Sequence, residues 1–284
     1  MKNNIFNLLG SLIAFYIPVQ IAYLTGSETV LKAVILAFII QWVCFIPAYL
    51  LQTEKFYDLT GSVTYLTLVL FSVFSTSSLG YASVIVCACV SVWAIRLGSF
   101  LFFRIKKDGE DKRFRSIKPN FTRFFMTWTL QGTWVTMCLL CVTTALSSTG
   151  GLSEGVGFYA GLVIFIGGFA LEVVADMQKT RFRKDPKNKS NFISSGLWAK
   201  SRHPNYLGEL ILWFGIAIMS VQSLEGLQYI TLISPLFVYV LLVYISGVRM
   251  LEDSGQKKWG NLPEYKEYIN NTPQLFISIK SMFR

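Results

Sequence analysis

Charged residues are scarce in this chain. Of its 284 residues, 15% are Asp, Glu, Lys or Arg and 53% are hydrophobic, whereas about 25% of residues are charged in an average soluble domain. This composition excludes an ordinary soluble domain. It indicates instead a polytopic membrane protein, in which long apolar segments cross the bilayer several times.

Metal-binding residues are almost as rare. The only histidine is His203, and the five cysteines all fall inside apolar runs rather than in loops, which is typical of buried thiols. Cys138 and Cys141 form a C-x-x-C spacing, but no second cysteine pair or nearby histidine completes a tetrahedral set of ligands. We therefore expect no metal site.

The sequence also lacks the G-x-G-x-x-G fingerprint of a Rossmann fold, so any dinucleotide would be held by another arrangement. Gly157 and Gly161 form a G-x-x-x-G spacing inside an apolar segment, which favours close packing of two helices over a phosphate-binding loop. The net charge of +10 does not indicate nucleic-acid binding. The basic residues lie in short loops between apolar segments, where they orient a membrane protein.

Segments long enough to span a bilayer recur along the chain. A helical span needs about 20 predominantly apolar residues, so we expect an all-α protein with about eight transmembrane helices. The first segment lacks a small-residue cleavage pattern, and we expect it to be a retained helix. The expected spans are residues 5–24, 30–51, 61–79, 82–103, 121–146, 155–174, 207–221 and 227–246.

Basic residues are distributed unevenly among the loops. Lys and Arg crowd residues 104–118, residues 179–202 and the tail after Val248, whereas the links near Ser27 and at residues 222–225 contain neither. Cytoplasmic loops carry the excess of Lys and Arg in membrane proteins. We therefore expect both termini and every basic loop to be cytoplasmic, which an even number of spans satisfies.

Polar residues cluster at the end of the sixth expected span. Glu172, Asp176, Lys179 and Arg183 follow one another at steps of four, three and four. If the helix continues past Val174, all four share one face. Such a face could contribute to a polar pocket, and a solvated helix end with internal ion pairs is an equally good explanation.

Two further clusters lie on the same expected membrane face. Arginine offers a planar fork that suits phosphate, and a proline at a helix start fixes the chain as it enters the membrane. Each residue alone is an ordinary juxtamembrane anchor, but the three clusters could converge. The second cluster is Lys200, Arg202, His203, Asn205 and Tyr206, and the third is Glu252, Asp253, Lys257, Lys258, Trp259, Tyr265 and Tyr268.

These clusters belong to a longer pattern. It comprises S-G-L-W-x-x-S-R-H-P-N-Y-x-G-E from Ser195 to Glu209, S-G-V-x-x-L-E from Ser246 to Glu252, and K-K-W-G before Tyr265 and Tyr268. The pattern resembles the steroid 5-alpha-reductase superfamily, and in particular its bacterial branch of uncharacterised membrane proteins with the reductase-like C-terminal domain. The resemblance is strongest over residues 168–273 and weaker upstream, over residues 56–61 and 96–98 and at Arg104.

The resemblance implies an NADPH-dependent reductase of a carbon–carbon double bond in a steroid-like or other lipid enone. It implies a cofactor cavity that faces the cytoplasm and a bacterial inner membrane. The membrane setting itself favours a lipid-soluble substrate and contact with membrane lipids, and we infer no obligate protein partner. Residues 1–120 would form the substrate side and residues 121–284 the reductase-like region. The implied cofactor-binding residues are Asp176, Gln178, Lys179, Arg183, Trp198, Arg202, His203, Asn205, Tyr206, Glu209, Glu252 and Tyr268.

The catalytic group is harder to assign. In steroid reductases a glutamate and a tyrosine from the N-terminal half hold the substrate carbonyl, and the sequence offers no secure alignment to them. Glu54, Tyr57 and Asp58, at the cytoplasmic edge of the second and third spans, are the available candidates. For Tyr57 an interfacial aromatic anchor is an equally good explanation.

Two other classes of function remain open. Membrane methyltransferases that act on isoprenylcysteine or phospholipid amines use S-adenosylmethionine and carry a similar R-H-P-x-Y-x-G motif. The paired cations Lys179 and Arg183 favour the reductase, because a sulfonium cofactor has no phosphates for them to bind. The third class is a non-enzymatic lipid-binding protein that keeps the fold without the chemistry.

Overall fold

The computed structural model describes residues 2–76, 79–148 and 150–277, and the described residues form helices and no strand. The chain divides into two units. Unit 1 comprises Met1–Tyr159 and Ala217–Ser234, and unit 2 comprises Ala160–Ile216 and Pro235–Arg284. Each unit is described below by itself.

The prediction of an all-α membrane protein is confirmed. Within the described ranges, eight helical segments are long and apolar enough to cross a membrane. The first seven are α1 (Lys2–Leu24), α2 (Glu28–Leu50), α3 (Tyr57–Phe74), α4 (Tyr81–Asp108), α5 (Phe121–Ser147), α6 (Val156–Lys184) and α7 (Pro204–Val221), and the eighth segment runs through α8 (Ile233–Val240) to the end of α9 (Val248–Trp259).

Some boundaries differ from those expected. The third span begins four residues earlier, at Tyr57, because the polar Y-D-L-T stretch already forms the first turn of α3. Residues 77 and 78, near the expected end of that span, lie outside the described residues. The sixth helix continues ten residues past Val174 to Lys184, as the shared polar face requires. The short helix α10 (Pro263–Asn271) follows α9.

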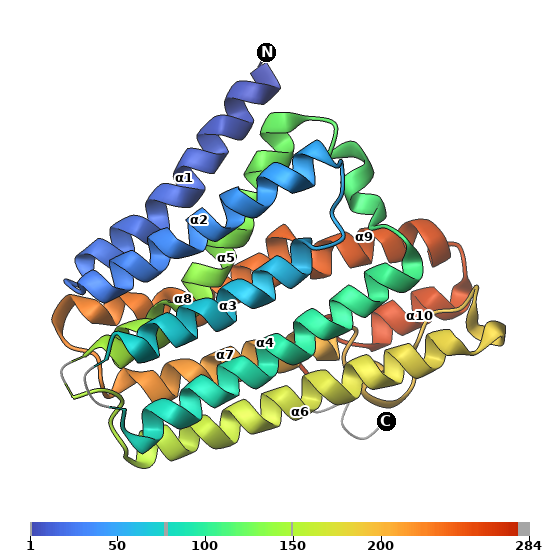
Figure 1. The fold of residues 1–284 in the computed structure, drawn as a ribbon. Coiled ribbons are helices and arrows are strands. Elements are labelled where there is room, and N and C mark those ends of the chain that lie inside the picture. Colours follow the sequence, from blue (N-terminus) through green and yellow to red (C-terminus); the bar gives the residue numbers. More distant parts are fainter. Residues whose placement is uncertain (1, 77–78, 149, 278–284) are drawn as a thin grey trace. The chain divides into compact units, whose positions relative to one another are not determined.

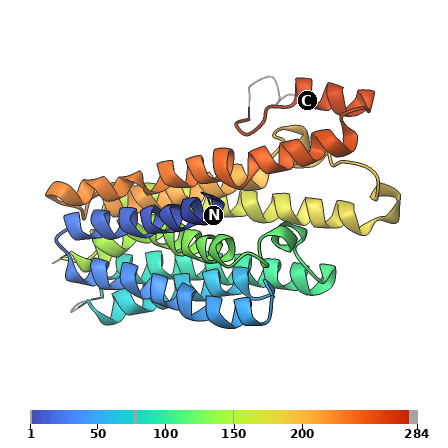
Figure 2. The ribbon, with the colours of Figure 1, turned by 90° about the horizontal axis from the view of Figure 1, so that it is seen from above.

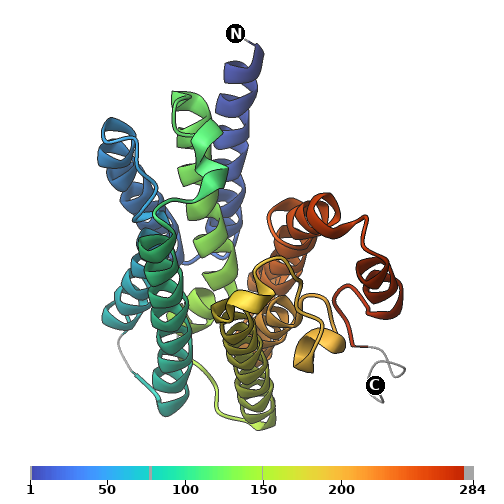
Figure 3. The same ribbon diagram turned by 90° about the vertical axis from the view of Figure 1, so that its right-hand side faces the viewer.

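Helix α5 forms the centre of unit 1, beside α1, α2 and α3 (Figures 1 and 3). It is the most buried of the spans although its mean hydropathy is among the lowest. Its threonines explain the difference, because Thr133, Thr136 and Thr143 donate their hydroxyl protons to carbonyls one turn earlier in the same helix. Polar side chains satisfied in this way can be buried inside a membrane bundle.

In unit 2, glycines bring α6 and α7 into backbone contact. A Cβ atom at Gly208 would lie 2.5 Å from the Glu172 nitrogen, and one at Gly215 would lie 2.7 Å from the Gly161 carbonyl oxygen. Gly168 lies equally close to the α7 backbone. The prediction that small residues serve helix packing is thus confirmed at Gly161. Gly157, in unit 1, lies instead against the Gln222 amide.

The eighth span is interrupted in unit 2. After α8, the residues Leu241–Ile245 form a π-helical turn, and the chain then bends at Ser246 and Gly247 before α9 begins. A Cβ atom at Gly247 would approach the Tyr206 ring to 3.1 Å, so glycine is needed here. π-Helical turns are frequent at functional sites, and this one places α9 beside the motif that begins α7.

Candidate functional site

The polar face of α6 is a continuous feature of unit 2. Because the helix runs unbroken to Lys184, Glu172, Asp176, Lys179 and Arg183 share one side of it. Their exposure rises along this face. Glu172 and Asp176 are 3% and 7% exposed, Lys179 is half-buried and Arg183 is exposed. Along this face toward the end of α6, buried acidic side chains are therefore followed by more accessible basic ones.

The segment after α6 turns back along the helix (Figure 2). Gly196 adopts a φ of +63°, and a Cβ atom there would clash with the Gln178 amide. The bend lets the Leu197 nitrogen donate to Gln178 Oε1 at 2.9 Å. It also lets the Trp198 indole nitrogen donate to the Ala175 carbonyl at 3.1 Å.

Lys179 is held against this returning segment. Its ammonium nitrogen lies 4.4 Å from the centre of the Trp198 ring, a distance at which an aromatic face attracts a cation. The predicted cofactor-binding residues Gln178, Lys179 and Trp198 are thus brought together by direct contacts.

The tail of the chain holds the start of the R-H-P-N-Y motif. The Ser201 hydroxyl donates to the Leu275 carbonyl at 2.7 Å, and the Arg202 nitrogen donates to the Pro273 carbonyl at 2.9 Å. The Tyr268 hydroxyl donates to the Trp198 carbonyl at 2.7 Å. Burial raises the pKa of Tyr268, so this phenol remains a donor across the ordinary pH range.

Glu252 on α9 binds two consecutive motif residues. One carboxylate oxygen accepts from the Arg202 guanidinium, and the other lies 2.6 Å from His203 Nε2. The His203 ring stacks on Tyr206, with centroids 5.9 Å apart and planes inclined by 14°. α7 and α9 therefore position His203 together, and the charge of Lys179 on α6 acts on the same ring, so the three polar clusters converge within unit 2.

The protonation of His203 follows from this environment. Burial lowers the pKa of its imidazole, and the charges of Lys179 and Arg202 act in the same direction, while Glu252 opposes them. A neutral ring next to a carboxylate carries its proton on Nε2, which donates to Glu252. Nδ1 is then a hydrogen-bond acceptor.

Three buried polar atoms of the motif have no hydrogen-bond partner among the described residues. They are Arg202 Nε, His203 Nδ1 and Asn205 Oδ1. A buried polar group without a partner is costly, so such atoms in one short motif indicate a binding site for a ligand or ordered water. The set offers one donor and two acceptors. A nucleotide fits it, because phosphate oxygens accept hydrogen bonds and ribose hydroxyls donate them.

A shallow depression of about 290 Å³ lies beside the motif in unit 2. Tyr268 and Phe192 line it together with Glu264 and Glu267. The two carboxylates would repel a polyanionic cofactor, so we do not assign a nucleotide to this depression. The cofactor cavity expected from the sequence remains a prediction.

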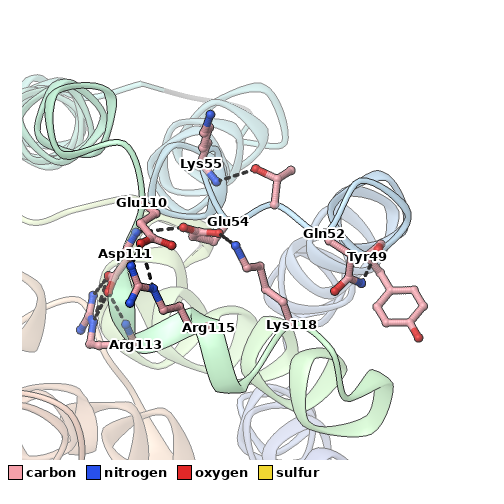
Figure 4. Close-up of polar contacts among 10 residues, drawn as sticks. Tyr49, Gln52, Glu54, Lys55, Glu110, Asp111, Arg113, Arg115 and Lys118 are labelled. Atoms are coloured by element: carbon pink, nitrogen blue, oxygen red, sulfur yellow. Dashed lines mark hydrogen bonds and ion pairs between the residues drawn. The ribbon is translucent and has the colours of Figure 1, made fainter.

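Glu54, in unit 1, is a structural anchor of the segment between α4 and α5 (Figure 4). Its carboxylate forms an ion pair with Lys118 and accepts a hydrogen bond from the Asp111 nitrogen at 2.9 Å. Asp111 in turn pairs with Arg113, and Glu110 pairs with Arg115. Both oxygens of Glu54 are therefore engaged by the chain itself.

The other two catalytic candidates lie at the start of α3. The Tyr57 hydroxyl donates to the Thr127 carbonyl at 3.0 Å, and its ring packs edge-on against Phe114 and Trp128. These contacts favour the anchor interpretation of Tyr57. Asp58 is half-buried in the first helical turn. A catalytic role for Glu54, Tyr57 or Asp58 stays a prediction.

Several residues that shape unit 2 were missed at the level of sequence. Gly168, Gly208 and Gly215 set the α6–α7 distance, and a seven-residue spacing of glycines in both helices was the available signal. Gly247 makes room for Tyr206. Ser201 and the Pro273 carbonyl act through contacts between residues about 70 positions apart, and no local sequence pattern indicates such contacts.

Comparison with known protein families shows which family the chain belongs to. The family described as "Protein of unknown function (DUF1295)" matches residues 44–272, most of the chain. The chain belongs to this family. It is a steroid 5-alpha-reductase-like membrane family. Membership of this family is compatible with a membrane reductase or a membrane methyltransferase.

A curated relative named "Probable O-methyltransferase ustE", from Ustilaginoidea virens, is 32% identical over 95 residues. The match covers 32% of this chain and 34% of that protein, so the chain spans about a third of the relative's length. No solved structure matches the chain significantly.

Proposed function

We propose that this protein is a membrane-embedded reductase that uses NADPH to reduce a carbon–carbon double bond in a steroid-like or other lipid enone. The observation that carries the proposal is the environment of His203. Two cations, Lys179 and Arg202, act on a neutral imidazole. The imidazole's own Nδ1, together with Arg202 Nε and Asn205 Oδ1, is buried without a hydrogen-bond partner among the described residues. Positive charge combined with open hydrogen-bonding capacity suits a phosphorylated nucleotide with sugar hydroxyls.

Each residue of the motif has a distinct part in this proposal. Arg202 Nε donates to a phosphate oxygen, while His203 Nδ1 and Asn205 Oδ1 accept from hydroxyl or amide groups. Lys179 and Arg183 attract the remaining phosphate charge. Glu252 does not touch the nucleotide in this scheme, because its two oxygens hold Arg202 and His203.

When bound, NADPH supplies a hydride for the β carbon of the enone. The protein must then provide a hydrogen-bond donor to the substrate carbonyl, since negative charge develops on that oxygen, and a proton must reach the α carbon to complete the reduction. Asp58 is the best of the three candidates because Glu54 and Tyr57 are engaged in structural contacts. Glu209, at the membrane end of the motif, completes the proposed cofactor set.

Isotope transfer tests the reaction. The protein in proteoliposomes would be given NADPH carrying deuterium at the transferable position and a panel of conjugated lipid ketones. We expect deuterium in the reduced lipid, detected by mass spectrometry, and its loss in Arg202→Met. Arg181→Met, which removes an exposed arginine of α6, is the matched control. Absence of deuterium from every enone, with NADPH bound, would exclude this substrate class.

An S-adenosylmethionine-dependent methyltransferase is the second candidate. It is favoured by the identity shared with a relative named as an O-methyltransferase. The same proteoliposomes with S-adenosylmethionine labelled in its methyl group provide the test. A labelled methyl group on a lipid would establish this function and overturn the reductase proposal.

We further propose that the chain lies in a bacterial inner membrane with both termini in the cytoplasm. The basic loops between α4 and α5 and between α6 and α7 support this orientation. Single cysteines at Lys112 and Lys187, in a background without native cysteines, should react with a membrane-impermeant reagent only from the cytoplasmic side. A cysteine at Ser153 should react from the opposite side, and labelling of Lys112 and Ser153 from one side would exclude this topology.

A further inference from the structure

Two glutamines are buried inside unit 1, within the membrane-spanning segments. Gln41 on α2 is fully buried and Gln131 on α5 is 7% exposed. Polar side chains are expensive at this depth and usually mark a binding site or a transport path. Neither residue belongs to the R-H-P-N-Y motif or to the catalytic candidates, so their presence needs its own explanation.

Both amides bind the same face of α3. Gln41 Nε2 donates to the Thr64 hydroxyl oxygen at 2.8 Å, and Gln131 Nε2 donates to the Tyr57 carbonyl at 3.0 Å. Tyr57, Gly61 and Thr64 are spaced by four and three residues, so they lie along one side of the helix. A Cβ atom at Gly61 would lie 2.5 Å from Gln131 Nε2. Glycine there makes room for the amide.

The hydrogen bonds fix which way each amide points. The Tyr57 carbonyl can only accept, so the NH2 group of Gln131 must face it. The Thr64 hydroxyl gives its one proton to the Thr60 carbonyl at 2.7 Å, so it too can only accept from Gln41. The carbonyl oxygens, Gln41 Oε1 and Gln131 Oε1, are therefore directed elsewhere. Both are buried without a partner in the described part of the chain.

A buried donor accompanies these two acceptors. The Trp128 indole nitrogen also lacks a partner among the described residues, and Trp128 precedes Gln131 by three positions on α5, which places both on one face. The Trp128 ring packs against Tyr57 with centroids 5.2 Å apart, and Gln131 bonds the carbonyl of the same tyrosine. The Trp128 ring and the Gln131 amide therefore both contact Tyr57.

We propose that Gln41, Gln131 and Trp128 form a binding site for the hydroxyl group of a neutral membrane lipid. A hydroxyl donates its one proton to one of the two amide oxygens at a time and accepts from the indole, so it complements both kinds of open atom. A ketone or an ether only accepts hydrogen bonds and leaves the amide oxygens unsatisfied. A charged head group would be desolvated here without a counter-charge from these three residues. The site does not depend on which cofactor unit 2 holds.

Photoaffinity labelling in proteoliposomes tests this site. The probes are a sterol alcohol and a linear long-chain alcohol, each carrying a diazirine, together with the methyl ether of each. We expect at least one alcohol to label α2, α3 or α5 about five- to twentyfold more than its ether, the range for one or two neutral hydrogen bonds. Gln41→Leu and Gln131→Leu should each reduce that preference, and the exposed Gln274→Leu should not.

The comparison of alcohol with ether in the unaltered protein decides the matter even if a leucine variant fails to fold. Equal labelling by alcohol and ether on both scaffolds overturns the proposal and leaves a trapped water as the donor to the two amides. A preference for the alcohol that survives both leucine substitutions also overturns it, because the hydroxyl would then bind elsewhere.

Discussion

The charged clusters of the two units differ in what their buried atoms contact. In unit 1, Glu54 is satisfied by Lys118 and by the Asp111 nitrogen. In unit 2, Glu252 binds Arg202 and His203, yet a polar atom of each of these two residues stays buried without a partner among the residues that the structure describes. A saturated cluster stabilises a loop, whereas unused hydrogen-bonding capacity indicates binding. The residue types alone do not separate the two cases.

The largest effect is expected from Glu54→Gln. The substitution removes the carboxylate that contacts the Lys118 ammonium, which is 16% exposed, and breaking a buried pair in this way costs about 3–5 kcal/mol. Denaturant unfolding of the detergent-solubilised protein measures it. Glu110→Gln, which removes an exposed pair with Arg115, should leave unfolding unchanged. Normal stability together with lost turnover would instead make Glu54 catalytic.

Arg183→Ala tests whether the charged cluster of unit 2 binds a cofactor. If Arg183 contacts a cofactor phosphate, its removal should weaken NADPH binding by about 1.5–3 kcal/mol, the range for hydrogen bonds to charged groups. The loss should shrink at high salt because Arg183 is exposed. Calorimetric titration measures both. Lys187→Ala, on the following turn, is the control, and equal losses at the two positions would indicate only a diffuse basic surface.

Gly208→Ala should disturb unit 2 without removing any charge. The added methyl group meets the α6 backbone 2.5 Å away, and such overpacking typically costs about 1–3 kcal/mol. Gly167→Ala is the matched control, because a Cβ atom at Gly167 has no neighbour within 4 Å and alanine favours the helix. Similar thermal unfolding of the two variants would contradict the close α6–α7 contact.

The smallest effect concerns pH. Burial keeps the pKa of His203 below its ordinary value, so the unfolded chain binds the proton more readily. Stability should therefore decline as the pH falls below about 6.5, the ordinary value for histidine. The variant His203→Gln keeps Lys179, Arg202 and Glu252 but has no imidazole to titrate. Its stability should therefore decline less than that of the unaltered protein as the pH falls. Identical pH profiles of unfolding for the two proteins would show that His203 titrates normally.

Much of the fold could be predicted from the sequence because its signals are local. Each span is an apolar run, and the face of Glu172, Asp176, Lys179 and Arg183 follows from helical spacing. The partners of Glu54 could not be predicted, because Lys118 is 64 positions away. The contacts of Arg202 with Pro273 and with Glu252 could not be predicted either, because these residues are also far apart in the sequence. The motif indicates candidate residues, and tertiary contacts determine which of their buried polar atoms lack a partner among the described residues.

Nitrogen NMR of the sole histidine tests the central claim most directly. The protein would carry an affinity tag without histidine and be labelled with ¹⁵N only in histidine, so that His203 alone contributes ring signals. At pH 7 we expect a neutral ring protonated on Nε2, and saturating NADPH should shift the Nδ1 signal as that atom accepts a hydrogen bond. A doubly protonated ring, or an Nδ1 signal that NADPH leaves unmoved, would contradict the account.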